Sequence, residues 1–141
     1  MAELVIAVTM KSGIIFPSAP AGRTISVLPP DVESAWREAR ITHNIGAYTA
    51  SEMMCRKILM HLAVDVAASP PGKHFVEYVN ALESAGYVMT NLKPVVNIVR
   101  DRGNAANHEL PASSEQDSLR TLTIIEHLLE GIYELPKLAG P

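Results

Sequence analysis

The sequence predicts an all-α protein, an antiparallel helical bundle of about five helices with a short N-terminal extended arm or β-hairpin. Three observations predict it. Apolar residues recur at helical spacing in successive segments from residue 31 onward, glycine and proline separate these segments, and the first 30 residues have a different pattern. The 141 residues, 48% hydrophobic and 19% charged, are enough for one domain with a packed core.

The N-terminal region, residues 1–27, is predicted to form an arm. Apolar runs at 4–8 and 14–16, separated by a turn at 11–13, indicate a β-hairpin. The prolines that follow fix the backbone in extended conformations and favour a linker laid against the rest of the chain. The remaining residues, 28–141, form the helical domain.

Each helix of this domain is predicted from an apolar stripe and its stop signals. Asp31, after two prolines, is the expected N-cap of the first helix. The second helix is apolar over so much of its circumference that we expect it at the centre of the bundle. Gly86 is expected to end the third helix. The predicted ranges of these three helices are 31–43, 45–67 and 73–85.

A fourth helix is predicted from about residue 91, with Pro94 in its first turn, where proline is tolerated. Ser113 and Gln116 have the spacing of a capping box and are expected to begin the last helix. Pro136 is expected to end it.

Composition and charge exclude several classes of protein. A net charge of −3 excludes the broadly basic surface with which proteins coat nucleic-acid duplexes. Cys55 is the only cysteine, so it has no disulfide partner within the chain, and it lies on an apolar stripe typical of a core residue. No apolar run approaches the roughly 20 residues that cross a bilayer. We therefore expect a soluble cytoplasmic protein without a membrane partner.

No cofactor and no metal site is predicted. The histidines at 43, 61, 74 and 127 are scattered, and no two of them have the i, i+4 spacing of zinc ligands on a helix. They are expected to be core or solvated histidines. Gly72 and Lys73 lack the upstream glycine of a phosphate-binding loop, so this turn gives no support for nucleotide binding.

Polar residues gather at the end of the fourth predicted helix in a way that helix packing does not require. On a continuous helix Arg100, Asn104 and His108 lie along one face. Arg102 instead continues the apolar stripe and is expected to point toward the bundle or a partner. Gly103 weakens the helix and allows a bend that would bring Arg102 and His108 together.

An arginine and a histidine that converge suit phosphate chemistry, because the guanidinium neutralises a phosphoryl group while imidazole exchanges protons near neutral pH. With the 2′-hydroxyl of RNA as nucleophile, Arg102 and His108 would support cleavage without a metal. The alternative interpretation is structural. Arg102 then bonds a helix-end carbonyl or a carboxylate such as Glu52 or Glu126. His108 and Asn107 then cap the helix.

Arg56 and Lys57 form a cationic pair within the apolar second helix. Arg56 is a candidate phosphate-binding residue together with Arg100 and Asn107. The alternative is that the pair binds acids such as Glu52 or lies on a solvated face.

Three stretches of the sequence carry a resemblance to a known family, LPPDVESAWREA at 28–39, GAYTASEMMCRKIL at 46–59 and RDRGNAANHEL at 100–110. Over residues 28–136 the chain resembles the family catalogued as domain of unknown function 4145, which is grouped with the HEPN superfamily of helical domains. The most specific element of the resemblance is an arginine followed by Gly-Asn and a histidine, here Arg102, Gly103, Asn104 and His108. Arg56 in the second helix supports it.

The resemblance implies a homodimer in which two arginine and histidine motifs face one another across a cleft. The five residues between Arg102 and His108 fit the ribonuclease motif of the superfamily, in which these two would be catalytic and Asn104 would orient them. The active pattern usually has a polar residue directly after the arginine, where this chain has Gly103. The resemblance also implies a place within or beside restriction or other phage-defence systems.

Two functions of different classes follow. The first is a non-catalytic or regulatory HEPN-like helical interaction module, acting as a dimer or with a protein partner of a phage-defence or anti-defence system. The alternative is a metal-independent endoribonuclease with RNA as substrate. An open cleft on which Arg102 and His108 converge would favour the nuclease, whereas a buried pair with all its donors satisfied would favour a structural role.

Overall fold

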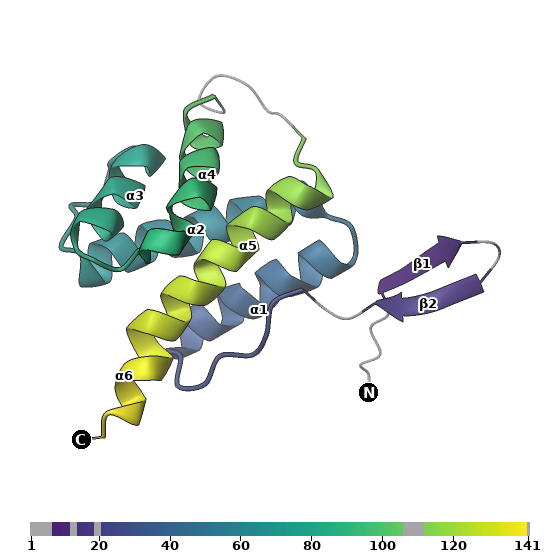
Figure 1. The fold of residues 1–141 in the computed structure, drawn as a ribbon, viewed down its shortest axis with the longest axis horizontal. Helices are drawn as coiled ribbons and strands as arrows, with labels where there is room; N and C mark the ends of the chain where they lie inside the picture. The colour runs from purple at the N-terminus through teal and green to yellow at the C-terminus, as the bar shows by residue number, and fades with distance from the viewer. Residues whose placement is uncertain (1–6, 12–13, 19–20, 106–111, 141) are drawn as a thin grey trace.

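The computed structural model describes residues 7–11, 14–18, 21–105 and 112–140. Its body is the predicted all-α bundle (Figure 1). The bundle helices are α1 (Pro30–Asn44), α2 (Tyr48–Val66), α3 (Phe75–Ser84), α4 (Lys93–Ala105) and α5 (Glu115–Leu129). The shorter elements are a 3-10 turn η1 (Thr90–Leu92), a π-helical turn η2 (Glu130–Glu134) and α6 (Leu135–Leu138). The N-terminal hairpin is present as antiparallel β1 (Ala7–Lys11) and β2 (Ile14–Ser18).

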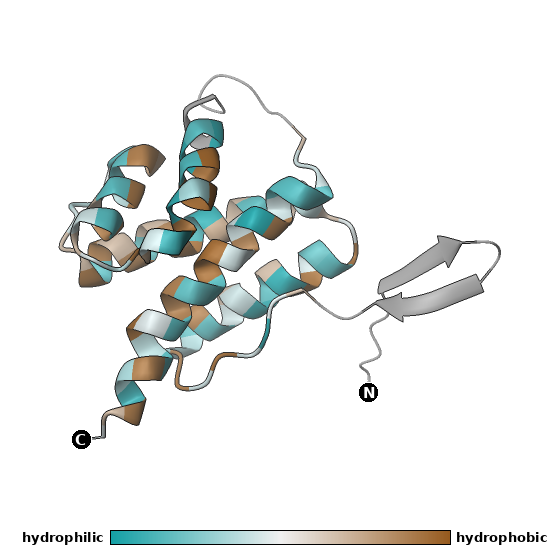
Figure 2. Cartoon of the chain, viewed as in Figure 1, coloured by the Kyte–Doolittle hydropathy of each residue, from teal (hydrophilic) through white to brown (hydrophobic). Residues whose placement is uncertain are grey.

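The helix α2 lies at the centre of the bundle, as its wide apolar circumference predicted. It contacts α1, α3 and α5, while α4 packs against α3 and α5. Apolar and polar residues alternate along these helices, which is the pattern of amphipathic segments that share one core (Figure 2). The largest fully buried apolar side chains come from four helices and include Trp36, Leu62, Leu82, Leu122 and Ile125.

The N-terminus of α1 differs from the prediction, because Asp31 is not its N-cap. Pro29 is the N-cap and Pro30 is the first helical residue. Proline suits that position since the first helical N–H group has no acceptor within the helix. Asp31 lies in the first turn, where its carboxylate accepts a hydrogen bond from Val32 N at 2.9 Å and complements the positive end of the helix dipole.

The second helix begins at Tyr48, later than the predicted start at residue 45. Gly46 adopts a left-handed conformation, with φ of +87°, directly after α1. Ala47 N donates to Thr42 O at 2.8 Å, and this bond closes a Schellman motif that ends α1. The residues of this motif are therefore outside α2.

The glycine expected to end α3 and the proline expected in the first turn of α4 are both found at those positions. Gly86, with φ of +87°, follows α3, and Tyr87 N donates to Leu82 O at 3.0 Å. The left-handed glycine thus ends the helix as predicted. Pro94 lies in the first turn of α4, which begins at Lys93.

The predicted capping box of the last helix is wrong by one residue. Ser114 is the N-cap of α5, and its hydroxyl accepts from Asp117 N at 3.0 Å. The Asp117 carboxylate accepts from Ser114 N at 2.9 Å. The expected pair of Ser113 and Gln116 is therefore replaced by Ser114 and Asp117.

Pro136 does not end the last helix. The chain continues from α5 through η2 into α6, and Pro136 occupies the first turn of α6. A prolyl nitrogen is tolerated there because it needs no acceptor. No helix in the part of the chain that the structure describes is long and apolar enough to cross a bilayer.

Candidate functional site

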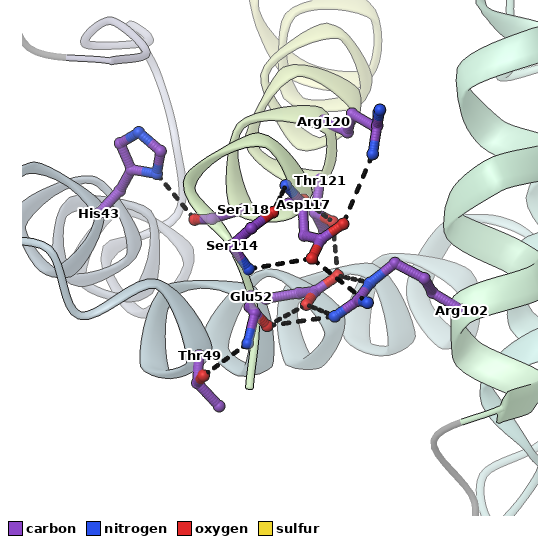
Figure 3. A network of polar contacts seen from close by, with 10 residues as sticks. His43, Thr49, Glu52, Arg102, Ser114, Asp117, Ser118, Arg120 and Thr121 are labelled. Atoms are coloured by element: carbon purple, nitrogen blue, oxygen red, sulfur yellow. Dashed lines mark hydrogen bonds and ion pairs between the residues drawn. The ribbon is translucent and has the colours of Figure 1, made fainter. Parts of the chain in front are cut away.

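A buried carboxylate, Glu52 on α2, is the centre of a polar network that joins α2, α4 and α5 (Figure 3). Glu52 is only 4% exposed. Arg102 on α4 approaches it with two nitrogens, Nη2 at 2.8 Å from Oε1 and Nε at 3.3 Å from Oε2. This is the two-pronged geometry in which arginine binds a carboxylate most strongly.

Two hydroxyl groups complete the surroundings of the Glu52 carboxylate. Ser113 Oγ donates a hydrogen bond to Oε1, and Thr121 Oγ1 lies 3.1 Å from Oε2. Ser113 is itself held in place, since its backbone N–H donates to Thr49 Oγ1 at 2.9 Å. A buried charge is tolerated only when it is paired and hydrogen-bonded, and Glu52 meets both conditions.

Arg102 has a second acidic partner in Asp117, the third residue of α5, which completes the capping box with Ser114. Arg102 Nη1 lies 3.3 Å from Asp117 Oδ2, and Arg120 Nη1 lies 3.5 Å from Asp117 Oδ1. Each of the three guanidinium nitrogens of Arg102 therefore faces a carboxylate oxygen of the protein. Of the acceptors considered from the sequence, Glu52 is the one that the structure shows.

The pKa shifts of this network follow from its contacts. Burial would raise the pKa of Glu52, but the hydrogen bonds from Arg102, Ser113 and Thr121 outweigh burial and hold this pKa below its ordinary value. The hydrogen bond to Glu52 raises the pKa of Arg102. The backbone N–H of Ser114 is the main cause of a lowered pKa at Asp117. The network is therefore fully ionised near neutral pH.

Arg100 lies near Arg102 in the sequence but contacts a different helix. Arg100 Nη2 is 2.6 Å from Glu83 Oε1 on α3, and its Nη1 is 2.7 Å from Asn97 Oδ1. Arg100 thus links α4 to α3, whereas Arg102 links α4 to α2 and α5. The structure does not bring these two predicted site residues to one spot.

Arg56 on α2 packs over an aromatic ring. Its guanidinium carbon is 4.4 Å from the centre of the Phe75 ring on α3, a cation–π contact. Burial lowers the pKa of Arg56, and Glu52 opposes this shift electrostatically. Among the described residues, no ion pair within 4.0 Å joins Arg56 to Glu52, although that pairing was one of the alternatives from the sequence.

Three of the predicted site residues are not placed by this geometry. His108 and Asn107 lie outside the described residues. Asn104 is described only by its backbone, which belongs to the last turn of α4. The convergence of Arg102 and His108 therefore stays a prediction.

Sequence reasoning missed the part that Ser113, Asp117 and Thr121 play. Glu52 did carry a signal, because it lies three residues before Cys55 on the buried face of α2. An acid on an apolar face requires a cation, and Arg102 was the cation found on an apolar stripe. Ser113, Asp117 and Thr121, which lie within α5 or just before it, could be found only from the packing of the helices.

A second buried polar pair lies near the start of α5. His43 Nδ1 on α1 is 2.7 Å from Ser118 Oγ, and the His43 ring meets the edge of the Tyr48 ring. Burial lowers the pKa of His43, and Glu115 partly opposes the shift. His43 is thus a core histidine. Within the described ranges no three His, Cys, Asp or Glu residues are close enough to hold a metal ion.

The network and the helices that position it fall within a stretch that matches a known family. The model of the family described as Domain of unknown function (DUF4145) matches residues 37–140. No curated protein and no solved structure matches the chain. Because the family model covers more than half of the sequence, the chain belongs to the family Domain of unknown function (DUF4145).

Proposed function

We propose that this chain is a non-catalytic, HEPN-like helical interaction module that pairs with a second copy of itself within a restriction or phage-defence system. The observation that carries the proposal is the binding of all three Arg102 guanidinium nitrogens by Glu52 and Asp117. The resemblance to the HEPN superfamily supports the pairing and the place in a defence system. The contacts of Arg102 support a role without catalysis.

A catalytic arginine must offer its donors to the phosphate. For Arg102 to do so, it would have to leave Glu52, and breaking a buried ion pair costs about 3–5 kcal/mol. A phosphate that approached Arg102 in place would also meet the negative charges of Glu52 and Asp117. Arg102 is therefore poorly placed to stabilise an additional negative charge, and its contacts instead hold α4 against α2 and α5.

The surface near the α1–α2 connection suits a partner. Ile41 and Ile45 are one helical turn apart, and they are 49% and 65% exposed. Met53, in the second turn of α2, is 56% exposed. All three belong to the last turn of α1, its C-cap or the first two turns of α2, and exposed large apolar side chains are enriched at interaction surfaces.

Catalysis is tested by incubating the purified chain in EDTA with labelled single-stranded RNA and transfer RNA, beside Arg102→Ala and His108→Ala. We expect no cleavage by any of the three proteins. Cleavage that leaves 2′,3′-cyclic phosphate ends, and that is lost in both folded variants, would replace the proposal with the metal-independent endoribonuclease.

Pairing is tested by light scattering during size-exclusion chromatography. We expect a dimer that Ile45→Asp converts to a monomer, because the substitution places a charge in the apolar contact. Leu138→Asp is the matched control, since Leu138 is equally apolar and 79% exposed but lies on α6. A monomeric wild-type chain at high concentration would contradict self-pairing.

A further inference from the structure

A small pocket lies between the segment that precedes α1 and α1 itself. Its volume is about 150 Å³, and it lies between residues 24–28 and the first three turns of α1. The ring of Trp36 forms part of its wall. Its polar lining consists of Thr24, Glu33, Arg37 and Arg40.

The walls of this pocket are fixed by specific contacts. Trp36 Nε1 donates to Arg23 O at 2.8 Å, and Ile25 is buried in the core. Gly22, with φ of +74°, packs so closely that a Cβ atom there would lie 3.1 Å from Trp36 Cζ2 and 3.2 Å from Arg40 Cγ. Residues 22–25 are therefore packed against α1, and the Arg40 side chain lies beside Gly22.

Arg40 is a half-buried cation with little compensation from the protein. Its Nη1 is 3.4 Å from Thr24 Oγ1, the upper limit for such a hydrogen bond, and its buried Nε has no partner among the described residues. Burial lowers the pKa of Arg40, and the more distant Glu126 opposes this shift only in part. A guanidinium has five N–H donors, and the contact with Thr24 is the one side-chain hydrogen bond that Arg40 donates among the described residues.

Other arginines of the chain are bound differently. Arg23, Arg100 and Arg102 each lie within 2.8 Å of a carboxylate oxygen. In the part of the chain that the structure describes, neither Arg37 nor Arg40 has such an ion pair. Two guanidinium groups and one carboxylate, that of Glu33, line the pocket, so its net charge is positive.

We propose that this pocket binds a small oxyanion, a phosphate or carboxylate group, between the guanidinium groups of Arg40 and Arg37. The planar fork of arginine matches the oxygens of either group, and the Thr24 hydroxyl supplies a further donor at the same mouth. The bound anion would supply the negative charge near Arg40 that no carboxylate within 4.0 Å supplies among the described residues. Its lining shares no residue with the Glu52 network.

The single tryptophan of the chain makes the test direct, because its indole N–H gives one NMR signal at the pocket wall. The full chain is titrated at constant ionic strength with inorganic phosphate and, separately, with acetate, against chloride as the reference salt. We expect a saturable shift of the Trp36 signal with at least one of the two anions. Saturation by phosphate alone identifies a phosphate site, and saturation by acetate as well identifies a general oxyanion site.

Two substitutions assign the binding. We expect Arg40→Gln to raise the dissociation constant at least tenfold and Arg37→Gln, at the exposed rim, at least threefold. Lys93→Gln removes an exposed positive charge on α4 and should leave the constant unchanged. The proposal is wrong if neither anion gives a saturable shift, or if both arginine variants bind like the wild type. If Arg40→Gln does not fold, the dissociation constant of Arg37→Gln alone tests the proposal.

Discussion

At the scale of single residues, Glu52 shows how one buried carboxylate can stabilise contacts among three segments. It accepts hydrogen bonds from Arg102 on α4, from Ser113 before α5 and from Thr121 within α5. The cost of burying a charge is offset because every side of the carboxylate is occupied. Through the same contacts Arg102 links α4 to α2.

Replacing Glu52 should therefore destabilise the fold. We expect Glu52→Ala to lower the free energy of unfolding by about 3 kcal/mol, because Arg102 and two hydroxyl groups lose their shared acceptor. Urea denaturation measures the change. Glu38→Ala, which removes an exposed carboxylate from α1, serves as the control and should stay within about 0.5 kcal/mol of wild type. A loss below about 1 kcal/mol for Glu52→Ala would contradict the role of this residue.

The buried His43 should make stability depend on pH. Its pKa in the folded chain lies below the ordinary value of 6.5, so the unfolded chain takes up the proton first. Stability is therefore unaffected by this group above pH 6.5 and falls as the pH decreases from 6.5 toward the folded pKa. The slope cannot exceed about 1.4 kcal/mol per pH unit for one group.

Urea denaturation at pH 7.5, 6.5 and 5.5 checks this dependence. His43→Gln should flatten the decrease, whereas His61→Gln, at an exposed position of α2, should retain it. An unchanged slope in His43→Gln would show that another group causes the decrease. Glu52 and Asp117 act in a lower window, because their pKa values lie below 4.5 and 3.8.

At the scale of elements, local signals predicted helices better than they predicted helix ends. Gly86 and Pro94 act through backbone conformation alone, and both were assigned correctly. The start of α5 depended instead on a tertiary contact. Ser113 and Ser114 are both suitable N-caps, but the Ser113 hydroxyl binds Glu52 and its N–H binds Thr49. The sequence pattern contains no information on these distant acceptors.

For the candidate site too, the sequence predicted the side of the helix on which a residue lies but not the partner that it contacts. The stripe of Val96 and Val99 predicted that Arg102 faces the bundle, and the structure agrees. Which acceptor it meets depends on how α2 and α5 pack, and the sequence left open a helix-end carbonyl or a carboxylate such as Glu52 or Glu126. Asp117 was not considered at all, because its role follows from the shifted capping box.

The shifted capping box can be tested by two alanine substitutions. We expect Ser114→Ala to destabilise the protein by about 1 kcal/mol, the usual loss for an N-cap. Gln116→Ala should be nearly neutral, because Asp117 occupies the third helical position in its place. Thermal or urea unfolding gives both values. Equal losses for the two variants would favour the box predicted from the sequence.

At the scale of the whole molecule, an ionic clasp joins Arg23 and Ser26, before α1, to the π-helical turn η2 near the C-terminus. Arg23 Nη2 lies 2.6 Å from Glu134 Oε1 and 2.5 Å from Glu130 Oε2. Ser26 adds hydrogen bonds of 3.0 Å to Glu134 Oε2 from its N–H and its hydroxyl. The hydrogen bond from Arg23 lowers the pKa of Glu134 to about 2, so the clasp remains charged at ordinary pH.

Removing this clasp should loosen the arm while the bundle stays folded. We expect the Ser26 amide to exchange with solvent several-fold faster in Glu134→Ala, because its acceptor is lost. Hydrogen exchange followed by NMR measures the rate, and the Leu62 amide in the core of α2 reports on the bundle. Raised salt should produce part of the same effect in the wild type, since the pair is partly exposed. Unchanged Ser26 exchange in Glu134→Ala would show that other contacts hold the arm.

The π-helical turn η2 determines where this clasp can form. A π turn is equivalent to one residue inserted into a continuous α-helix, so it changes the phase of every position that follows. Deletion of Gly131 would restore the α-helical phase and rotate Glu134 by about 100° around the axis, away from Arg23. The number of residues in this turn thus sets the direction in which the Glu134 side chain points and so whether it reaches Arg23.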